Sequence, residues 1–181
     1  MQFPVIFKPN CGGMGIAVSK CDTFTQLEES FSVWWSITSK SCSDKTTLVQ
    51  EYIRSTQPHV VRAEFISGKF HYAVLVDNQH GFELCPADQC KSESEPEKEC
   101  NTRPRFLITK TIPDYVKAPL ESFVQHIGLE ICGIEYIQDG SDAVFVYDVN
   151  VNTNYNSEAE KTAGVEGGMI ALLRFFNHLF S

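Results

Sequence analysis

The stretch Tyr147-Asp148-Val149-Asn150-Val151-Asn152 closes an apolar, β-branched segment of the chain. Successive side chains of a strand point to opposite faces, so Asp148 and Asn150 are predicted to share one face, with Phe145, Tyr147 and Val149 on the other. Carboxylate and amide oxygens are the ligands that hard cations prefer. This stretch therefore predicts a metal-binding face at the end of a β-strand.

A second carboxylate is expected opposite the first. Residues 131–138 read as a strand that contains Glu135, and Asp139-Gly140-Ser141-Asp142 reads as a turn that leads into a strand over 143–150. Folding about this turn places Glu135 opposite Asp148, and two adjacent carboxylates repel unless a cation lies between them. We therefore expect Glu135, Asp148 and Asn150 to hold Mg²⁺. The alternative is that Glu135 and Asp148 simply face water on an exposed sheet.

A glycine-rich loop lies near the N-terminus, in Phe7-Lys8-Pro9-Asn10-Cys11-Gly12-Gly13-Met14-Gly15. It connects two predicted strands, 3–8 and 16–19, as a hairpin. Glycines let backbone N–H groups approach a phosphate, and Lys8 adds a positive charge. The loop matches neither a Walker A motif nor the dinucleotide fingerprint. A glycine-rich hairpin turn that binds nothing is the alternative.

The remaining segments predict an α+β fold of antiparallel hairpins with helices packed against them. A helix over 24–38 has an apolar face of Phe24, Leu27, Phe31, Trp34 and Trp35. Further strands are expected at 47–53, 60–66 and 70–76, with a hairpin turn at Ser67-Gly68-Lys69, and a helix at 114–127. Residues 78–105 are polar and acidic, which predicts a mobile loop. The last helix is expected to turn Ile170, Leu173, Phe176 and Leu179 inward.

Two further segments carry polar groups that suit an anionic ligand. The extended segment Val49-Gln50-Glu51-Tyr52-Ile53 can present backbone groups to the edge of an adenine. Arg62 and Glu64 share one face of the next strand, from which Arg62 can reach a phosphate or a substrate carboxylate. The alternative for Arg62 is a surface ion pair with Glu64.

Composition excludes several function classes. The 181 residues suit one domain or two small lobes, and a net charge of −8 with scattered Lys and Arg disfavours nucleic acid. No apolar run reaches the roughly 20 residues of a membrane span. The seven cysteines are an odd number and suit reduced thiols, so we expect a cytoplasmic protein. His80, Cys85, Cys90 and Cys100 lack the spacing of a zinc site, and no hydrolase motif occurs.

Taken in order, Pro4-Val5-Ile6-Phe7-Lys8-Pro9 with its glycine loop, Gln50 to Ile53, Arg62, Glu135 and Asp148 to Asn150 resemble the ATP-grasp superfamily, and most nearly its RimK-like carboxylate-amine ligases. The resemblance implies an N-terminal lobe, 1–53, and a C-terminal lobe, 54–181, around a nucleotide cleft. It implies phosphate contacts from Lys8, Gly12, Gly13 and Gly15, and an adenine and ribose site at Gln50, Glu51, Tyr52 and Ile53. It also implies Mg²⁺, or Mn²⁺ in its place, on Glu135, Asp148 and Asn150. We further expect Arg62 to be the catalytic cation and, from their polar character near the predicted cleft, Asn154 and Asn156 to contact the substrate.

The function implied by this resemblance is an ATP-dependent ligase of the acid–amino acid type. A carboxylate is activated as an acylphosphate and joined to an amine, and both partners are small molecules or peptides; an oligomer is left open. Family members carry a further domain before the equivalent of Phe3, so the chain is expected to be a fragment. They also have a Ser-Pro-Gly-like stretch where this chain has 152–156, and an acidic residue where it has Val61. The alternatives are a nucleotide-binding module without turnover, a phosphotransferase of the same fold, and a structural domain.

Overall fold

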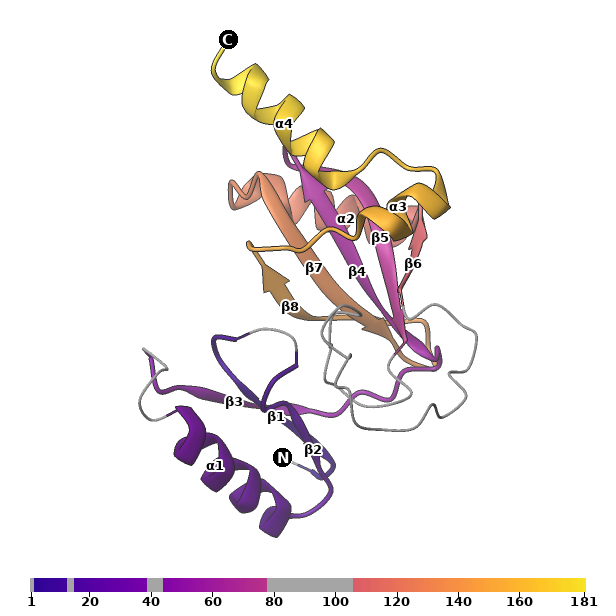
Figure 1. The fold of residues 1–181 in the computed structure, drawn as a ribbon. Coiled ribbons are helices and arrows are strands. Elements are labelled where there is room, and N and C mark those ends of the chain that lie inside the picture. The colour runs from indigo at the N-terminus through magenta and orange to yellow at the C-terminus, as the bar shows by residue number, and fades with distance from the viewer. Residues whose placement is uncertain (1, 13–14, 39–43, 78–105) are drawn as a thin grey trace, which may run out of the picture. The chain divides into compact units, whose positions relative to one another are not determined.

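A computed structural model describes residues 2–12, 15–38, 44–77 and 106–181 (Figure 1). The chain divides into two compact units at Ile53/Arg54. Among the described residues, unit 1 comprises 2–12, 15–38 and 44–53, and unit 2 comprises 54–77 and 106–181. The loop predicted over 78–105, with its histidine and three cysteines, lies outside the described residues, and so does Gly13.

Unit 1 is a small antiparallel sheet with one helix against it. The strands are β1 (Val5–Pro9), β2 (Ser19–Cys21) and β3 (Thr47–Glu51), in the order β2-β1-β3. Helix α1 (Phe24–Thr38) packs on the face that carries the buried side chains of Val5, Phe7 and Cys21, and it contributes Trp34 to this core. The predicted helix and the predicted hairpin are confirmed, but the second strand lies at Ser19–Cys21 and not at 16–19.

The apolar face predicted for α1 is only partly buried. Trp34 is buried and Leu27 packs against the core, but Phe24 and Trp35 are 62% and 47% exposed. The sheet beneath α1 has three strands of three to five residues, which is too narrow to cover the whole apolar face of a 15-residue helix. The expectation that Phe24 and Trp35 face the core is therefore wrong.

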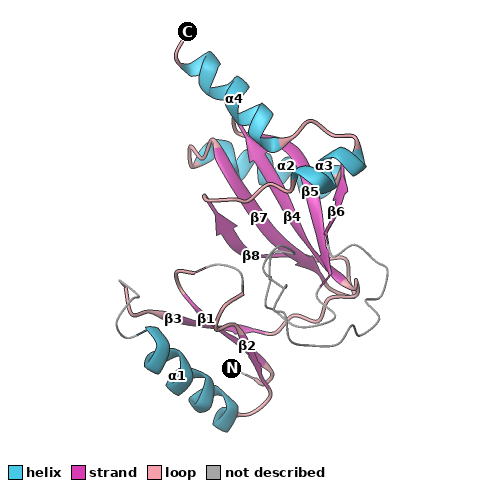
Figure 2. Cartoon of the chain, in the orientation of Figure 1, coloured by secondary structure: helices cyan, strands magenta, loops and turns pink. Residues whose placement is uncertain are grey.

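Unit 2 is built on a five-stranded antiparallel sheet with helices on both faces (Figure 2). The sheet order is β6-β5-β4-β7-β8. Its strands are β4 (His59–Ile66), β5 (Lys69–Asp77), β6 (Phe106–Thr109), β7 (Ile131–Gln138) and β8 (Val144–Asn150). Its helices are α2 (Asp114–His126), α3 (Ser157–Ala163) and α4 (Gly168–Leu179). The sequence predicted all of these except the short β6 and the separation of α3 from α4.

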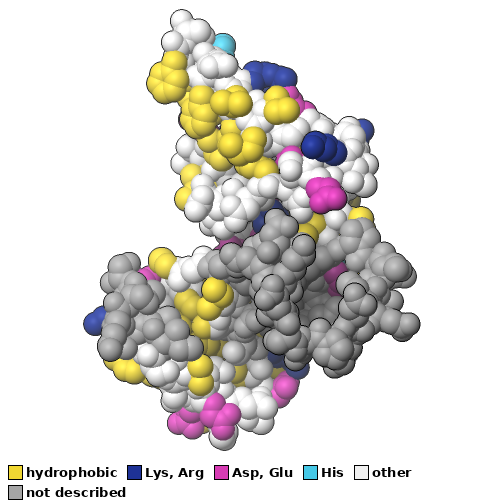
Figure 3. Space-filling view, viewed as in Figure 1, with side chains coloured by type: hydrophobic (Ala, Val, Ile, Leu, Met, Phe, Trp, Pro, Cys, Tyr) yellow, Lys and Arg dark blue, Asp and Glu magenta, His cyan; other side chains and the backbone are white. Residues whose placement is uncertain are grey.

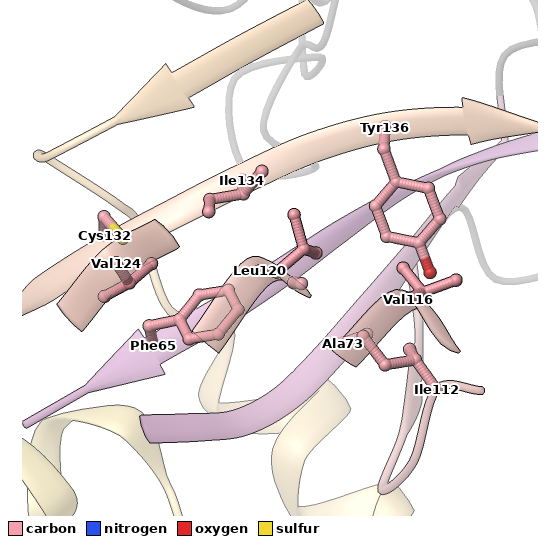
Figure 4. Close-up of a cluster of buried hydrophobic side chains, with 10 residues drawn as sticks. Phe65, Ala73, Ile112, Val116, Leu120, Val124, Cys132, Ile134 and Tyr136 are labelled. Carbon is pink, nitrogen blue, oxygen red and sulfur yellow. The ribbon is translucent and has the colours of Figure 1, made fainter. Parts of the chain in front are cut away.

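The main core of unit 2 lies between the sheet and α2 (Figure 4). Its buried side chains come from strands β4, β5 and β7, from helix α2 and from the residue two positions before α2: Ala63, Phe65, Ala73, Cys132, Ile134, Tyr136, Val116, Leu120, Val124 and Ile112. The hairpin between β4 and β5 turns at Ser67 and Gly68, which both have positive φ (57° and 66°), as a two-residue type I′ turn requires. The predicted turn is confirmed.

Helices α3 and α4 cover the opposite face of this sheet. Ile66 alternates with Phe65 along β4, so its contacts with Ala171 and Phe175 place α4 on the face away from α2. The buried carboxylate of Glu160 in α3 accepts hydrogen bonds from the Tyr72 hydroxyl (2.6 Å) and from the Gly168 N–H (2.8 Å). This carboxylate therefore ties α3 to β5 and to the first turn of α4.

The inward face of α4 differs from the predicted one. The buried residues of α4 are Gly168, Ala171 and Phe175, whereas the four predicted core residues are exposed: Ile170 (59%), Leu173 (61%), Phe176 (42%) and Leu179 (51%). Figure 3 shows apolar side chains gathered along this helix. Because α4 is apolar on most sides, periodicity cannot identify the face that packs. No helix in the described parts of the chain is long and apolar enough to cross a membrane.

Substitutions on the buried and exposed faces of α4 are expected to change the stability of unit 2 by different amounts. We expect Phe175→Ala to destabilise unit 2 by roughly 3 kcal/mol, because it removes a buried aromatic ring, and Leu173→Ala to change stability by about 0.5 kcal/mol or less. Urea unfolding of both variants, monitored by circular dichroism, measures the difference. A larger loss for Leu173→Ala would contradict this orientation of the helix.

Candidate functional site

Strand β7 gathers the predicted polar residues of unit 2 on one face of the sheet. The Cα register places Glu135 of β7 between Arg62 of β4 and Asp148 of β8, and it places Gly133 opposite Asn150. Directly paired residues of antiparallel strands share a face. Neighbouring Ile134 packs toward α2, so the polar set lies on the other face. The structure thus confirms that Glu135 pairs with Asp148.

A β-bulge in β8 alters the predicted alternation. Glu135 pairs with Asp148 but Tyr136 pairs with Val146, so Tyr147 is an extra residue. As a result, Phe145 and Tyr147 share the face of Glu135, and the prediction that they point away from Asp148 is wrong. The pKa of the Tyr147 phenol is raised well above its usual value by burial, and also by the adjacent carboxylates, chiefly Glu135, to which it is hydrogen-bonded. The sequence analysis missed this tyrosine.

The donor set at this position fits a hard cation. It consists of two carboxylates on paired positions, Glu135 and Asp148, and the amide oxygen of Asn150 two residues further on the same face. The backbone N–H of Asn152 donates to Asn150 Oδ1 (2.8 Å), which fixes the orientation of this side chain. No group of three or more His, Cys, Asp or Glu side chains suited to a metal occurs in the described residues. Among the predicted metal ligands, the third oxygen donor is therefore an amide, that of Asn150, and not a third carboxylate.

Arg62 and Glu64 form an ion pair, but it is not a surface pair. Arg62 Nε donates to Glu64 Oε1 at 2.7 Å, and the side chain of Glu64 is fully buried while that of Arg62 is 16% exposed. Burial raises the pKa of the Glu64 carboxyl, and the guanidinium of Arg62 opposes this shift, as does the hydroxyl of Thr153. The ion pair therefore lies on the polar face of the sheet and is buried there.

The loop over residues 151–156 folds back onto the sheet above this pair. Thr153 and Tyr155 are half-buried, whereas Asn154 is exposed and its carbonyl accepts a hydrogen bond from Arg62 Nη2 (3.0 Å). Asn156 caps α3, because its side-chain oxygen accepts from the N–H groups of Glu158 and Ala159. Both residues predicted to contact substrate therefore make contacts within the protein, Asn154 through its backbone carbonyl and Asn156 through its side chain.

In unit 1, Lys8 and Gln50, two of the predicted phosphate and base residues, share the face of the sheet away from α1. Val5 and Phe7 face α1, so Ile6 and Lys8 face the other way, and the register places Gln50 beside Ile6 on that same face. Lys20 of β2 also pairs with Ile6, and its Nζ lies 5.1 Å from the centre of the Tyr52 ring. The sequence analysis missed Lys20, which follows the predicted second strand and pairs with Ile6.

The base of the glycine loop is held by Asp44. Its carboxylate accepts from Asn10 Nδ2 (2.7 Å) and from Cys11 Sγ (3.3 Å), and Asn10 N–H donates to the carbonyl of Thr46. Gly12 is exposed, and Gly15 has a φ of 70°, which favours glycine. The two described glycines of the predicted phosphate loop therefore lie in a turn whose start is fixed.

Strand β3 is an edge strand within the described sheet of unit 1. The N–H of Tyr52 donates to the Pro4 carbonyl, so the backbone groups of Tyr52 point toward β1. Those of its neighbours Glu51 and Ile53 consequently point away from the sheet. This is the arrangement that a base recognised through backbone groups requires.

Two hollows in the described units are lined by other residues. One of about 330 Å³ lies between β2 and α1 and is lined by Lys20 and Trp34, among others. The other, of about 350 Å³, lies beside α4 and is lined by Ile66, Phe175 and Arg174, among others. Neither of these two hollows is lined by a predicted site residue.

Comparison with solved structures identifies the fold. The chain matches the biotin carboxylase domain of the Hydrogenobacter thermophilus 2-oxoglutarate carboxylase, solved with MgADP and bicarbonate, with a TM-score of 0.63 and 15% identity over 96% of this chain and 36% of that one. It matches the ATP-grasp ligase PsnB, solved with a minimal precursor, with a TM-score of 0.58 and 18% identity over 96% of this chain and 48% of that one. It also matches the D-alanine–D-alanine ligase of Bacillus anthracis, solved with ATP, with a TM-score of 0.57 and 12% identity over 98% and 52%.

The chain therefore has the ATP-grasp fold, as its sequence predicted. It spans roughly a third to a half of the length of these three structures. No family model matches the sequence, and no curated protein matches it.

Gly133 offers a test of how the loop over residues 151–156 packs against the sheet. A Cβ at this position would lie 2.8 Å from Thr153 Cγ2, 3.2 Å from Glu64 Oε2 and 3.3 Å from Arg62 Cδ. We expect Gly133→Ala to destabilise unit 2 by roughly 1–3 kcal/mol, because these groups must move. Thermal unfolding measures the loss.

Thr153→Ser supplies the control for this prediction, because it removes the methyl group that the new Cβ would meet and keeps the hydroxyl. The double variant Gly133→Ala, Thr153→Ser should recover part of the stability lost in Gly133→Ala. Full additivity of the two single changes would contradict the contact.

Proposed function

We propose that this chain is the ATP-binding part of a carboxylate-amine ligase. The observation that carries the proposal is the register of β7, which aligns Arg62, Glu135 and Asp148 across three strands of an ATP-grasp fold, with Asn150 on the same face. A cation and a cluster of oxygen donors on one rigid surface suit the binding of Mg²⁺ together with phosphates. The solved ligases that this fold resembles add support.

Both units carry residues that we propose to bind Mg²⁺ and ATP. In unit 1, Lys8 and the N–H groups at Gly12, Gly13 and Gly15 bind phosphates, Glu51 and Ile53 present backbone groups to the base, and the side chains of Gln50 and Tyr52 lie beside the ribose. In unit 2, Glu135, Asp148 and Asn150 hold Mg²⁺, with Mn²⁺ as a substitute, and Arg62 neutralises the transferred phosphoryl group. Asn154 and Asn156 lie on the substrate side. Bound Mg²⁺ supplies charge neutralisation between the phosphates.

The proposed reaction uses this arrangement of charge. A carboxylate oxygen of the first substrate attacks the γ-phosphorus of ATP, and ADP leaves with the bonding electron pair. The amine of the second substrate then attacks the acyl carbon, loses a proton, and expels inorganic phosphate as the amide bond forms. The part played by Lys8 and Arg62 is to hold the phosphates in line and to offset their negative charge.

The first test is nucleotide binding. We expect Mg²⁺-dependent binding of a non-hydrolysable ATP analogue in calorimetric titrations, and we expect Asp148→Asn to weaken it roughly tenfold or more, because a carboxylate ligand of the cation becomes neutral. Asp142→Asn in the same hairpin is the matched control. Asp142 has a φ of 63°, which Asn adopts readily, and it lies in the turn. Equal losses in both variants, or no binding by the folded chain, would contradict the proposal.

Lys8 provides a separate test in unit 1. We expect Lys8→Ala to weaken binding of the analogue by about 1.5–3 kcal/mol, which is roughly tenfold or more, because a charge-assisted contact to phosphate is lost. Lys69→Ala, at an exposed strand end of unit 2, is the control and should bind normally. Titration with adenosine distinguishes the two parts of the ligand, since its affinity should not depend on Lys8. Unchanged affinity of Lys8→Ala for the analogue would refute the phosphate contact.

A further inference from the structure

Glu64 is a fully buried carboxylate on the face of the sheet that carries the candidate metal ligands. Its neighbours are Arg62 on its own strand, Gly133 on β7 and Thr153 in the loop above. Burying an ion pair is unfavourable enough that well-packed apolar residues of similar size are often at least as stabilising. Stability alone therefore does not account for a glutamate at this position.

Arg62 is held at two points of its guanidinium group. Nε donates to Glu64 Oε1 at 2.7 Å, and Nη2 donates to the carbonyl of Asn154 at 3.0 Å. These two contacts fix the plane of a flexible side chain, as paired contacts to a guanidinium do. Neither contact uses Nη1, so the guanidinium keeps N–H groups for a third partner.

The position of Arg62 indicates what this partner is. Arg62 pairs with Glu135, and Glu135 pairs with Asp148, so Arg62 is one strand away from the carboxylate pair on the same face. In the proposed function, that pair holds the Mg²⁺ that accompanies the phosphates of ATP. The proposed function assigns the terminal phosphoryl group to Arg62.

Gly133 makes this arrangement compatible with close packing. It lies opposite Glu64 on β7, and the space that a Cβ would take is bounded by Glu64 Oε2, Arg62 Cδ and Thr153 Cγ2. The buried carboxylate, the guanidinium and the loop thus meet where β7 has no side chain.

We propose that Glu64 is a positioning residue, whose buried carboxylate and the carbonyl of Asn154 together aim Arg62 at the terminal phosphoryl group. Glu64 does not itself touch the nucleotide. The role of Arg62 as a phosphate contact rests on the proposed function, but the fixation of Arg62 by Glu64 is a property of the protein without ligand. The two parts are tested separately.

The first experiment measures hydrogen exchange of the Arg62 Nε–H group by ¹⁵N NMR, with its resonance identified by its loss in Arg62→Lys. We expect Glu64→Leu to accelerate this exchange roughly tenfold or more, and Glu64→Gln to accelerate it less, because the amide oxygen of glutamine can still accept. Glu166→Gln, which alters the exposed pair with Arg174, is the matched control and should leave Arg62 unchanged. An unchanged rate in Glu64→Leu overturns the inference, whatever the nucleotide measurements show.

The second experiment compares the affinities of the Mg²⁺ complexes of a non-hydrolysable ATP analogue and of ADP. We expect Arg62→Ala to lower the preference for the triphosphate roughly tenfold, Glu64→Leu to lower it by a similar factor, and the double variant to match Arg62→Ala. Glu64→Gln provides the conservative variant and should retain part of the preference. If Glu64→Leu keeps the wild-type preference, or if the two effects add in full, the inference is overturned. Absence of nucleotide binding by the wild-type protein would instead contradict the proposed function.

Discussion

The pairing of β7 with strands on both of its sides is the constraint on which the polar face of unit 2 depends. A shift of one residue in the register of a strand would move every side chain to the other face. Cys132, Ile134 and Tyr136 are buried against α2, and this burial opposes such a shift. Glu135 is consequently held on the opposite face, between Arg62 and Asp148. The apolar core and the candidate metal site are two results of one register.

Much of this arrangement could be predicted because it rests on short-range patterns. The alternation along 131–138 and 144–150, joined by a tight turn, was enough to pair Glu135 with Asp148. The bulge at Tyr147 could not be predicted, because one extra residue in a strand leaves no mark in composition. The inward face of α4 was also missed, since its apolar residues surround the helix and only the contact with Ile66 selects Ala171 and Phe175.

The candidate site shows the same division between local and tertiary information. Strand alternation placed Arg62 and Glu64 on one face, but their burial depends on the loop over 151–156, which returns across the sheet and contacts Arg62 through Asn154. A polar segment of this kind has no periodicity from which its path can be read. In unit 1, Lys8 was found by its place beside glycines, whereas Lys20 has no such neighbours and was missed, although it lies on the same face.

The bulge at Tyr147 also divides β8 into two halves. One half contributes Val144 to the core beneath α2, and the other carries Asp148 and Asn150 on the polar face. With uninterrupted alternation, the face that carries Asp148 would carry Val144 as well, and Val144 would be withdrawn from the core beneath α2. The extra residue reverses the alternation of side chains between the two halves of the strand. The half nearest the turn therefore directs Val144 toward the core beneath α2, while the half that bears Asp148 and Asn150 presents both on the opposite face. A single inserted residue thereby lets one short strand supply both the apolar core and the polar face.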